Sequence, residues 1–437
     1  MEQATSSEGS GDSGGRDHIV VEINESLATS IRRKMESISS SHSICKINES
    51  LLKANEKAYV PAKVSIGPYH HGKEQFKFME EHKWRYVYAL LSRRPNLETV
   101  LDDCVAALKQ LEGRAVSCYS EKTNFTSDEF LKIMLIDGCF LIELFMKYSM
   151  KSLRRRNDII FSTAGMLFDL RCDFILLENQ IPLFVLLRLF QLVPIPKQCT
   201  FSLPELAFRY FKNMIPGDQN FHREKFNEEG HHLLDLIGHC LLPKYPKLPK
   251  KLAESERQLH SATELRRNGI KFKRSWTENL LDIRFGKNVL EIPPIILHQY
   301  TESLFRNLIQ LEHCSRDNVQ HITSYAFLMK SLIRNEKDVK LLEKRDILIN
   351  YDAAEKEVPK FFDRICQEVT LNESYYDGLF EHVYGYGRGT RSWSKRLKRS
   401  YQRNPMLRLV LIIAILALLL TVIGTLFSVL SFSLHRL

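Results

Sequence analysis

The chain has 437 residues and a formal net charge of +10 at pH 7. Eight of its lysines and arginines lie between Arg388 and Arg408, a stretch without aspartate or glutamate, so subtracting them leaves +2 for the rest. Because the basic character is confined to one segment, we expect no nucleic acid as a partner. The nine cysteines are scattered singly without a C-x-x-C pair, a pattern typical of reduced thiols rather than of a disulfide framework.

The N-terminal part is predicted to consist of a tail and one large helical domain. Residues 1–18 are rich in serine, glycine and glutamate, which is typical of a disordered segment, and they resemble no signal peptide. Residues 19–384 then form the main domain, in which most apolar residues follow helical spacing. In the segment 74–93 this spacing defines a face that we expect to be buried, made of Phe76, Met79, Val87, Leu90 and Leu91.

Two apolar segments are predicted to form the centre of this domain. Residues 130–145 are apolar on almost every side, so we expect a buried helix there. In residues 169–190, Pro182 suits the first turn of a helix but not its interior. We therefore expect a helix up to about Glu178, a break at Asn179–Ile181 and a second helix from Pro182.

The pattern changes after the helical segments. Prolines among charged residues at 243–258 predict a loop and a possible domain linker. The short runs Gly269–Lys273, Leu280–Phe285 and Val289–Pro293 follow, and the last two flank Gly286–Asn288. They predict a small antiparallel β element with a hairpin.

The C-terminal residues form the longest apolar run. From Leu409 to Leu430 there is no charged residue, and a helix of this length would span about 33 Å, more than the hydrocarbon core of about 30 Å. We predict a transmembrane helix at 409–432, a short tail at 433–437 and a basic juxtamembrane segment at 385–408. The expected fold class is mainly α, with a large helical domain, a small antiparallel β element and one C-terminal transmembrane helix.

The basic segment predicts an orientation and a partner. Positive residues before a span favour the cytosolic side, so we expect a single-pass protein with its N-terminal domain in the cytosol, and the plasma membrane is a compatible location. Each cation near a bilayer adds about 1 kcal/mol of attraction to anionic lipid. The lipid bilayer is therefore an expected partner, and the residues expected to contact it are Arg388, Arg391, Lys395, Arg396, Lys398, Arg399, Arg403 and Arg408.

The histidines and cysteines form no recognisable metal motif. His70 and His71 are adjacent in a glycine- and proline-rich turn, and neighbouring side chains point in different directions, so we expect a structural or binding turn. Residues 231–240 hold two histidines followed, two helical turns later, by a histidine and a cysteine. This spacing differs from the i,i+3 or i,i+4 spacing of metal ligands on one helix.

Acidic residues offer one alternative chemistry. Asp169 and Asp173 are four apart and share a face of a helix, and Glu178 follows closely. Such a group suits a divalent metal and phosphoester hydrolysis, although pairing with Arg171 or capping of the break before Pro182 is a simpler explanation. The sequence lacks the common nucleotide-binding, nucleophile-elbow and zinc-protease motifs, so we assign no catalytic residue, cofactor or metal ligand.

A set of segments, taken in order along the chain, carries a family resemblance. They are Ile44–Gly72, Met134–Phe145, Asp169–Val185, His231–Pro243, Ala262–Lys273 and the apolar C-terminal run. Together they resemble the plant domain of unknown function 247 family, also catalogued as uncharacterised protein family 0481. The resemblance implies a plant source, a mostly helical domain and a C-terminal membrane helix, and it supplies no catalytic residues. Some members are tied to pollen–stigma self-recognition in grasses, which implies recognition rather than catalysis.

Two functions from different classes follow from the sequence. The first is a C-terminally anchored membrane protein whose helical domain binds another protein in recognition or signalling. The alternative is a membrane-associated, metal-dependent hydrolase that uses Asp169, Asp173 and Glu178. A stabilising effect of calcium, magnesium or manganese on the domain would favour the hydrolase.

Overall fold

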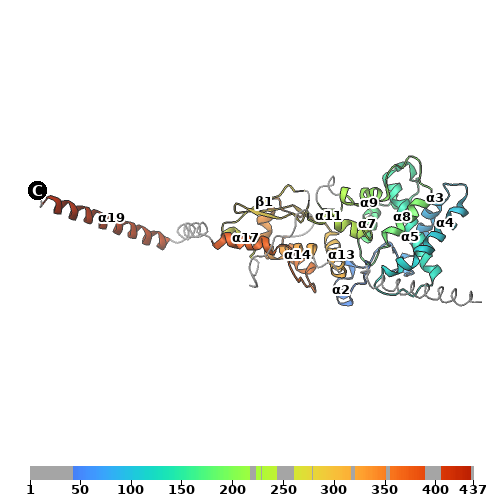
Figure 1. Cartoon of the computed structure of the whole chain (residues 1–437), viewed down its shortest axis with the longest axis horizontal. Coiled ribbons are helices and arrows are strands. Elements are labelled where there is room, and N and C mark those ends of the chain that lie inside the picture. The colour runs from blue at the N-terminus through green and yellow to red at the C-terminus, as the bar shows by residue number, and fades with distance from the viewer. Residues whose placement is uncertain are drawn as a thin grey trace, which may run out of the picture. The chain divides into compact units, whose positions relative to one another are not determined.

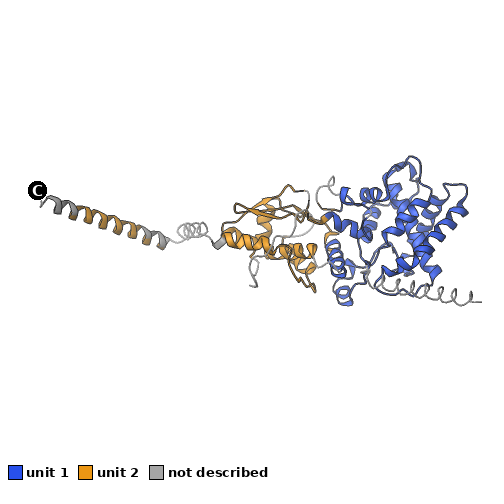
Figure 2. Ribbon diagram, viewed as in Figure 1, with its two compact units in different colours: residues 1–214, 222–240, 303–318 blue, residues 215–221, 241–302, 319–437 orange. Residues whose placement is uncertain are grey.

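The fold was determined from a computed structural model of the chain, and its elements are numbered as in Figure 1, which labels the larger ones. The structure describes residues 43–216, 223–227, 229–243, 260–277, 279–315, 320–350, 355–388 and 405–434. The chain divides into two compact units (Figure 2). Unit 1 comprises residues 1–214, 222–240 and 303–318, and unit 2 comprises residues 215–221, 241–302 and 319–437. The predicted tail at 1–18 and most of the predicted linker, from 244 to 258, lie outside the described residues.

Unit 1 is built from helices. Its described α-helices are α2 (Glu49–Ala54), α3 (Lys77–Leu91), α4 (Leu97–Ser117), α5 (Ser127–Ser149), α6 (Ile159–Ser162), α7 (Met166–Phe174), α8 (Leu183–Leu192), α9 (Leu203–Phe211), α11 (Leu233–Leu241) and most of α13 (Thr301–Cys314). Three short 3₁₀ helices join them, namely η1 (Glu56–Ala58), η2 (Glu74–Phe76) and η3 (Lys151–Leu153).

Helix α5 is the centre of unit 1. It begins with a capping box, in which Thr126 and Glu129 satisfy each other's backbone amides. Every residue from Phe130 to Lys147 except Lys132 is buried, and the helix packs against α3, α4, α8 and α9. The predicted buried helix at 130–145 is therefore confirmed, and its apolar composition on all sides follows from having neighbours on all sides.

A break separates α7 from α8 as the sequence predicted. Helix α7 ends at Phe174, four residues before the predicted end, and Pro182 is the N-cap of α8. The early end has a physical cause, because two amide side chains of the break bind the last carbonyl groups of α7. Asn179 Nδ2 donates to the Asp173 carbonyl at 3.0 Å, and Gln180 Nε2 donates to the Phe174 carbonyl at 2.7 Å.

Unit 2 combines helices with short strands. Its described elements are α12 (Ala262–Arg267), β1 (Lys271–Arg274), β2 (Arg284–Gly286), β3 (Val289–Ile292), β4 (Ile295–Leu297), α14 (His321–Leu332), α15 (Glu336–Glu343), β5 (Leu348–Asn350), α16 (Glu357–Ile365), α17 (Asp377–Arg388) and α19 (Pro405–Leu434). The predicted hairpin is present, because β2 and β3 pair antiparallel around Lys287 and Asn288, whose φ angles are +47° and +63°.

The prediction of an antiparallel β element is wrong in two respects. Strand β1 pairs with the other edge of β3 in the parallel direction, with Lys271 opposite Val289 and Arg274 opposite Ile292. The three-stranded sheet is therefore mixed. A second sheet of two strands, β4 and β5, is parallel. Parallel pairing joins segments through longer connections, so hairpin signals in the sequence do not reveal it.

The fold class needs a second correction, at the C-terminus. Helix α19 covers the predicted transmembrane segment at 409–432, but within the described residues no helix is long and apolar enough to cross a membrane.

Candidate functional site

The acidic residues proposed from the sequence lie in unit 1, and two of them bind backbone amides. Asp173, on α7, accepts the N–H groups of the three consecutive residues 62–64, at distances of 2.8, 2.7 and 2.8 Å. Glu178, in the break after α7, accepts the N–H group of Ile47 at 2.7 Å. Asp169 is only half-buried on α7. The structure thus uses Asp173 and Glu178 to hold the N-terminal segment of unit 1.

Two further side chains bind the same segment. We name residues 61–72 the anchored loop. Asn179 Oδ1 accepts the N–H group of Ile66 at 2.6 Å, and Asp137 Oδ2, on α5, accepts that of Gly67 at 2.8 Å. The loop is largely buried, so its amides need partners inside the protein. Side chains from α5, α7 and the break supply them where a neighbouring strand would otherwise do so.

Lys83 completes this network from α3. Its Nζ lies 2.6 Å from Asp137 Oδ1 and 2.6 Å from Glu80 Oε1, and it also donates to the Ser65 carbonyl. The ammonium group is fully buried. A buried charge is tolerated only with such close partners, so Lys83 and Asp137 form a structural pair rather than a free reactive group.

Burial and hydrogen bonding set the proton affinity of these acids. Burial raises the pKa of Asp173 to about 6, although three amide donors act in the opposite direction. Burial also raises the pKa of Asp137, against the effect of Lys83. Burial acts to raise the pKa of Glu178 as well, but hydrogen bonds, first of all from His70, outweigh it and lower that pKa.

The metal-dependent alternative has no structural support. The oxygen atoms of Asp173 and Glu178 are engaged by donors of the protein itself. Within the described residues, no group of three histidine, cysteine, aspartate or glutamate side chains could hold a metal ion. Asp169, Asp173 and Glu178 therefore do not form the site that the sequence suggested.

The histidines of the motifs serve the fold as well. His70 Nε2 lies 3.0 Å from Glu178 Oε2, and its Nδ1 lies 2.8 Å from Lys73 Nζ, which supports the predicted structural turn. In the second group, His231 Nδ1 lies 2.9 Å from Asp235 Oδ2, and His239 Nε2 lies 3.5 Å from Asp235 Oδ1. None of the nine cysteines forms a disulfide bond in the structure.

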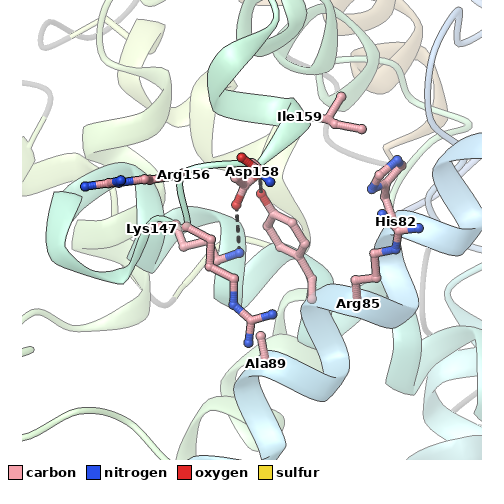
Figure 3. Close-up of a pocket in the computed structure, with 10 residues that line it drawn as sticks. His82, Arg85, Ala89, Lys147, Arg156, Asp158 and Ile159 are labelled. Atoms are coloured by element: carbon pink, nitrogen blue, oxygen red, sulfur yellow. Dashed lines mark hydrogen bonds and ion pairs between the residues drawn. The ribbon is translucent and has the colours of Figure 1, made fainter.

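A pocket of about 390 Å³ lies elsewhere on unit 1, between α3 and the segment that follows α5. The residues that line it are His82, Arg85, Tyr86, Ala89, Lys147, Arg155, Arg156, Asn157, Asp158 and Ile159. In its interior, Asp158 Oδ1 accepts the Tyr86 hydroxyl at 2.7 Å and Oδ2 lies 2.8 Å from Lys147 Nζ (Figure 3). The Lys147 ammonium also lies 3.6 Å from the centre of the Tyr86 ring.

Three arginines give this pocket its charge. Arg85, Arg155 and Arg156 are exposed, and none of their side chains forms an ion pair or hydrogen bond with a residue in the described part of the chain. The one acid of the lining, Asp158, is balanced by Lys147. Burial, reinforced by Arg85, lowers the pKa of His82, so this imidazole is neutral at pH 7. The lining thus has three uncompensated positive charges.

The outer face of α3, next to the pocket, carries large aromatic residues. Phe78 is 55% exposed, Trp84 49% and Tyr88 64%. Trp84 and Tyr88 are four apart, and Phe78 and Arg85 are seven apart, so all four lie on the same side of the helix. We name these four residues the α3 face. The buried face predicted for this segment is confirmed, but the sequence analysis did not single out the aromatic residues opposite it.

The basic segment at the C-terminus is not tested by the structure. Arg388 ends α17 and Arg408 lies in α19, but their side chains are not described. The remaining members lie outside the described residues, and they are Arg391, Lys395, Arg396, Lys398, Arg399 and Arg403. The suggested contact of these residues with lipid stays a prediction.

Comparison with known proteins identifies the family of the chain. The model of a family described as a plant protein of unknown function, DUF247, matches residues 44–420. UPF0481 protein At3g47200 of Arabidopsis thaliana is 30% identical over 418 residues, which cover 89% of this chain and 86% of the relative. Putative UPF0481 protein At3g02645 of the same plant is 23% identical over 458 residues, with 82% and 84% coverage. No solved structure matches the chain significantly. The chain belongs to the DUF247 family of plant proteins of unknown function.

Proposed function

We propose that this protein is a recognition protein whose unit 1 binds an acidic segment of another protein. The observation that carries the proposal is the α3 face, where Phe78, Trp84 and Tyr88 are about half exposed or more beside the unpaired Arg85. Aromatic residues and arginine are the side chains most enriched at the energetic centres of protein interfaces. A folded domain gains nothing from exposing them in one group unless a partner covers them.

Charge indicates the kind of partner. The α3 face borders the pocket, and Arg85 belongs to both. The pocket adds Arg155 and Arg156, so a segment lying along α3 meets aromatic surface and positive charge together. An acidic segment with apolar side chains complements this surface, and its binding should weaken with salt.

The hydrogen bonds that the buried acids accept from the backbone support the same proposal. Asp173 and Glu178, two of the three acids of the hydrolase alternative, each hold a backbone amide, and so does the buried Asp137. The three arginines of the surface pocket, by contrast, form no ion pair or side-chain hydrogen bond within the described residues. Recognition through this surface therefore accounts for the exposed groups, whereas hydrolysis through the acids does not.

The proposal is tested by crosslinking from the α3 face. A photoreactive aromatic amino acid is placed at position 88 of the full chain, which is expressed in plant cells, and the crosslinked peptides are identified by mass spectrometry. We expect a partner segment in which aspartate and glutamate outnumber lysine and arginine. A synthetic copy of that segment should bind the purified full chain, and its affinity should fall with rising salt.

Paired variants decide whether the α3 face makes the contact. Trp84→Ala with Tyr88→Ala should weaken binding of the synthetic segment by about tenfold or more, because aromatic anchors contribute most of the energy of such an interface. Trp276→Ala is the matched control, since Trp276 is 79% exposed but belongs to unit 2. Crosslinked segments that are neutral or basic, or unchanged binding by the α3 variant, would refute the proposal.

A further inference from the structure

We infer that the pocket beside α3 binds a phosphoryl group carried by a side chain of the partner segment. The inference rests on the proposed function and specifies the chemistry of the ligand. We name Arg85, Arg155 and Arg156, together with the Tyr86–Asp158–Lys147 cluster beneath them, the arginine pocket.

The size and walls of the arginine pocket suit such a group. A volume of about 390 Å³ falls within the range of about 300–1,000 Å³ typical of ligand pockets. Arg85 is contributed by α3, and Arg156 by the segment after η3 (Lys151–Leu153). In Figure 3 these two side chains lie on opposite sides of the Asp158 carboxylate. Because both residues line the pocket, they offer guanidinium groups from two different parts of the chain to a bound anion.

The charge of the pocket favours phosphate over carboxylate. A phosphorylated side chain carries a charge of about −1.5 to −2 at pH 7 and three acceptor oxygens. A carboxylate carries one charge and two oxygens. Three arginines, each with a planar fork of N–H donors, match the larger charge and the larger number of acceptors.

The cluster beneath the arginines is arranged so that its acid does not repel the ligand. Both oxygens of Asp158 are engaged, one by the Tyr86 hydroxyl and one by Lys147. Lys147 is itself buried and lies 3.9 Å from Glu143. These contacts connect α3, α5 and the segment after η3, so they fix the base of the pocket and leave the exposed arginines free to bind.

The neighbouring Arg154 uses its guanidinium group to stabilise the fold. Arg154 donates from Nε to the Lys147 carbonyl and from Nη2 to the Tyr148 carbonyl, both at 2.7 Å. It ties its segment to the end of α5. Arg155 and Arg156 follow directly and have no such contacts in the described part of the chain. Arg154 thus has the structural role, and the adjacent Arg155 and Arg156 have the ligand-binding role.

The test compares peptide pools on the purified full chain. The probes are degenerate acidic peptides with a central phosphoserine or phosphotyrosine, the same pools with glutamate at that position, and inorganic phosphate. We expect the phosphorylated pools to bind at least about tenfold more tightly than the glutamate pools, because charge-assisted bonds to a dianion are stronger. The triple variant Arg85→Gln, Arg155→Gln and Arg156→Gln should abolish this difference.

Matched variants separate charge, geometry and folding. Arg94→Gln is the control, since Arg94 is exposed near the end of α3 and does not line the pocket. The triple change of the three pocket arginines to lysine keeps the charge but removes the planar fork, so the preference for phosphate should be reduced but not lost. An unchanged melting temperature of each variant shows that the fold is intact, because the altered residues are exposed.

The remaining outcomes distinguish this inference from the proposed function. Equal binding of glutamate and phosphorylated pools would overturn the phosphoryl inference and leave acidic recognition standing. Inorganic phosphate binding as tightly as the peptides would assign the pocket to free phosphate. Binding of phosphoinositide vesicles that the arginine variant abolishes, without peptide binding, would assign it to a lipid headgroup. Failure of every pool together with negative crosslinking at position 88 would overturn both proposals.

Discussion

At the scale of single residues, the side chains that look most reactive in the sequence are those that hold the backbone. Asn179 accepts from Ile66, 113 positions earlier in the chain, and donates to two carbonyl groups. Asp173 holds a segment 109 to 111 positions away. A single sequence shows that these residues are polar within an apolar run, but not which amides they meet. It therefore predicted the break correctly, but it could not identify the distant amides that the acids bind.

Asn179→Ala should lower the free energy of unfolding by about 3 kcal/mol, because it leaves a buried amide and two buried carbonyl groups without partners. Pro182→Ala should change it by less than about 1 kcal/mol, since Pro182 sits at the N-cap of α8 where no helical N–H bond is lost. Urea unfolding followed by circular dichroism measures both. A larger loss for Pro182→Ala than for Asn179→Ala would contradict this account of the break.

His232 should make the fold sensitive to mild acid. The imidazole is fully buried, and burial lowers its pKa below the ordinary value of 6.5. Its Nε2 lies 2.8 Å from the Ser43 carbonyl, and its Nδ1 accepts the Asp235 N–H at 3.2 Å, so protonation of Nδ1 would break a hydrogen bond. Below pH 6.5 the unfolded chain binds a proton that the folded chain does not. Stability is therefore complete above about pH 6.5 and falls as the pH decreases.

Unfolding at about pH 5 and about pH 7 tests this sign. His232→Gln should reduce the difference in unfolding free energy between the two pH values, because the substituted side chain does not titrate. His260→Gln is the control, since His260 is exposed. If His232→Gln keeps the full acid sensitivity of the wild type, other groups cause it.

At the scale of elements, the sequence predicted the structure formed by residues close together in the chain and missed the structure formed by residues far apart in it. The apolar pattern located α5 and the buried face of α3, and the residues at 286–288 located the β2–β3 hairpin. The parallel partner of β3 and the arginine pocket depend on segments brought together by the fold. The aromatic residues of the α3 face were visible as exceptions to the polar outer side, but the spacing alone did not assign them a role.

The anchored loop depends on a glycine at one position. Gly67 has φ +75°, and a Cβ atom there would meet the Gln180 carbonyl oxygen. Gly67→Ala should therefore destabilise the protein by about 3 kcal/mol or more, from backbone strain and from collision. Gly72 has φ +81° but open space around it, so Gly72→Ala should cost only about 1 kcal/mol. Melting temperatures of the two variants measure the contrast, and equal losses would refute the close approach.

At the scale of the whole molecule, unit 1 is assembled from separated stretches of chain. Residues 303–318 belong to it although they follow much of unit 2 in the sequence. Within this stretch, Asn307 accepts the Leu177 N–H and donates to the Ala58 carbonyl, both at 2.8 Å. The apolar side chains that this stretch buries are Leu304, Phe305, Leu308 and Ile309. Unit 1 is thus not a continuous piece that can be cut at the end of α11.

A fragment of residues 1–240 should therefore fail to fold stably. It loses four buried apolar side chains worth about 2 kcal/mol each, a total comparable with the whole stability of a domain. Near-ultraviolet circular dichroism should show lost tertiary packing. Fusing residues 303–318 to this fragment through a glycine–serine linker should restore a cooperative melting transition. A fragment that melts cooperatively without the added stretch would contradict the assignment of 303–318 to unit 1.

The two sides of helix α3 have different roles: the inner side stabilises the fold, and the outer side is exposed. Lys83 and Tyr86 face inward and bind Asp137 and Asp158, whereas Trp84 and Tyr88 face outward. The Lys132 ammonium lies 5.5 Å from the centre of the Trp84 ring, and such an exposed contact contributes little. Substitution on the outer side should therefore cost little folding free energy, so this side can vary while the inner side stays constant. Exchanging the outer residues of α3 between two relatives should transfer partner choice from one to the other with the melting temperature unchanged. Under the proposed function, membership of the family predicts the scaffold, and the outer side of α3 predicts the partner.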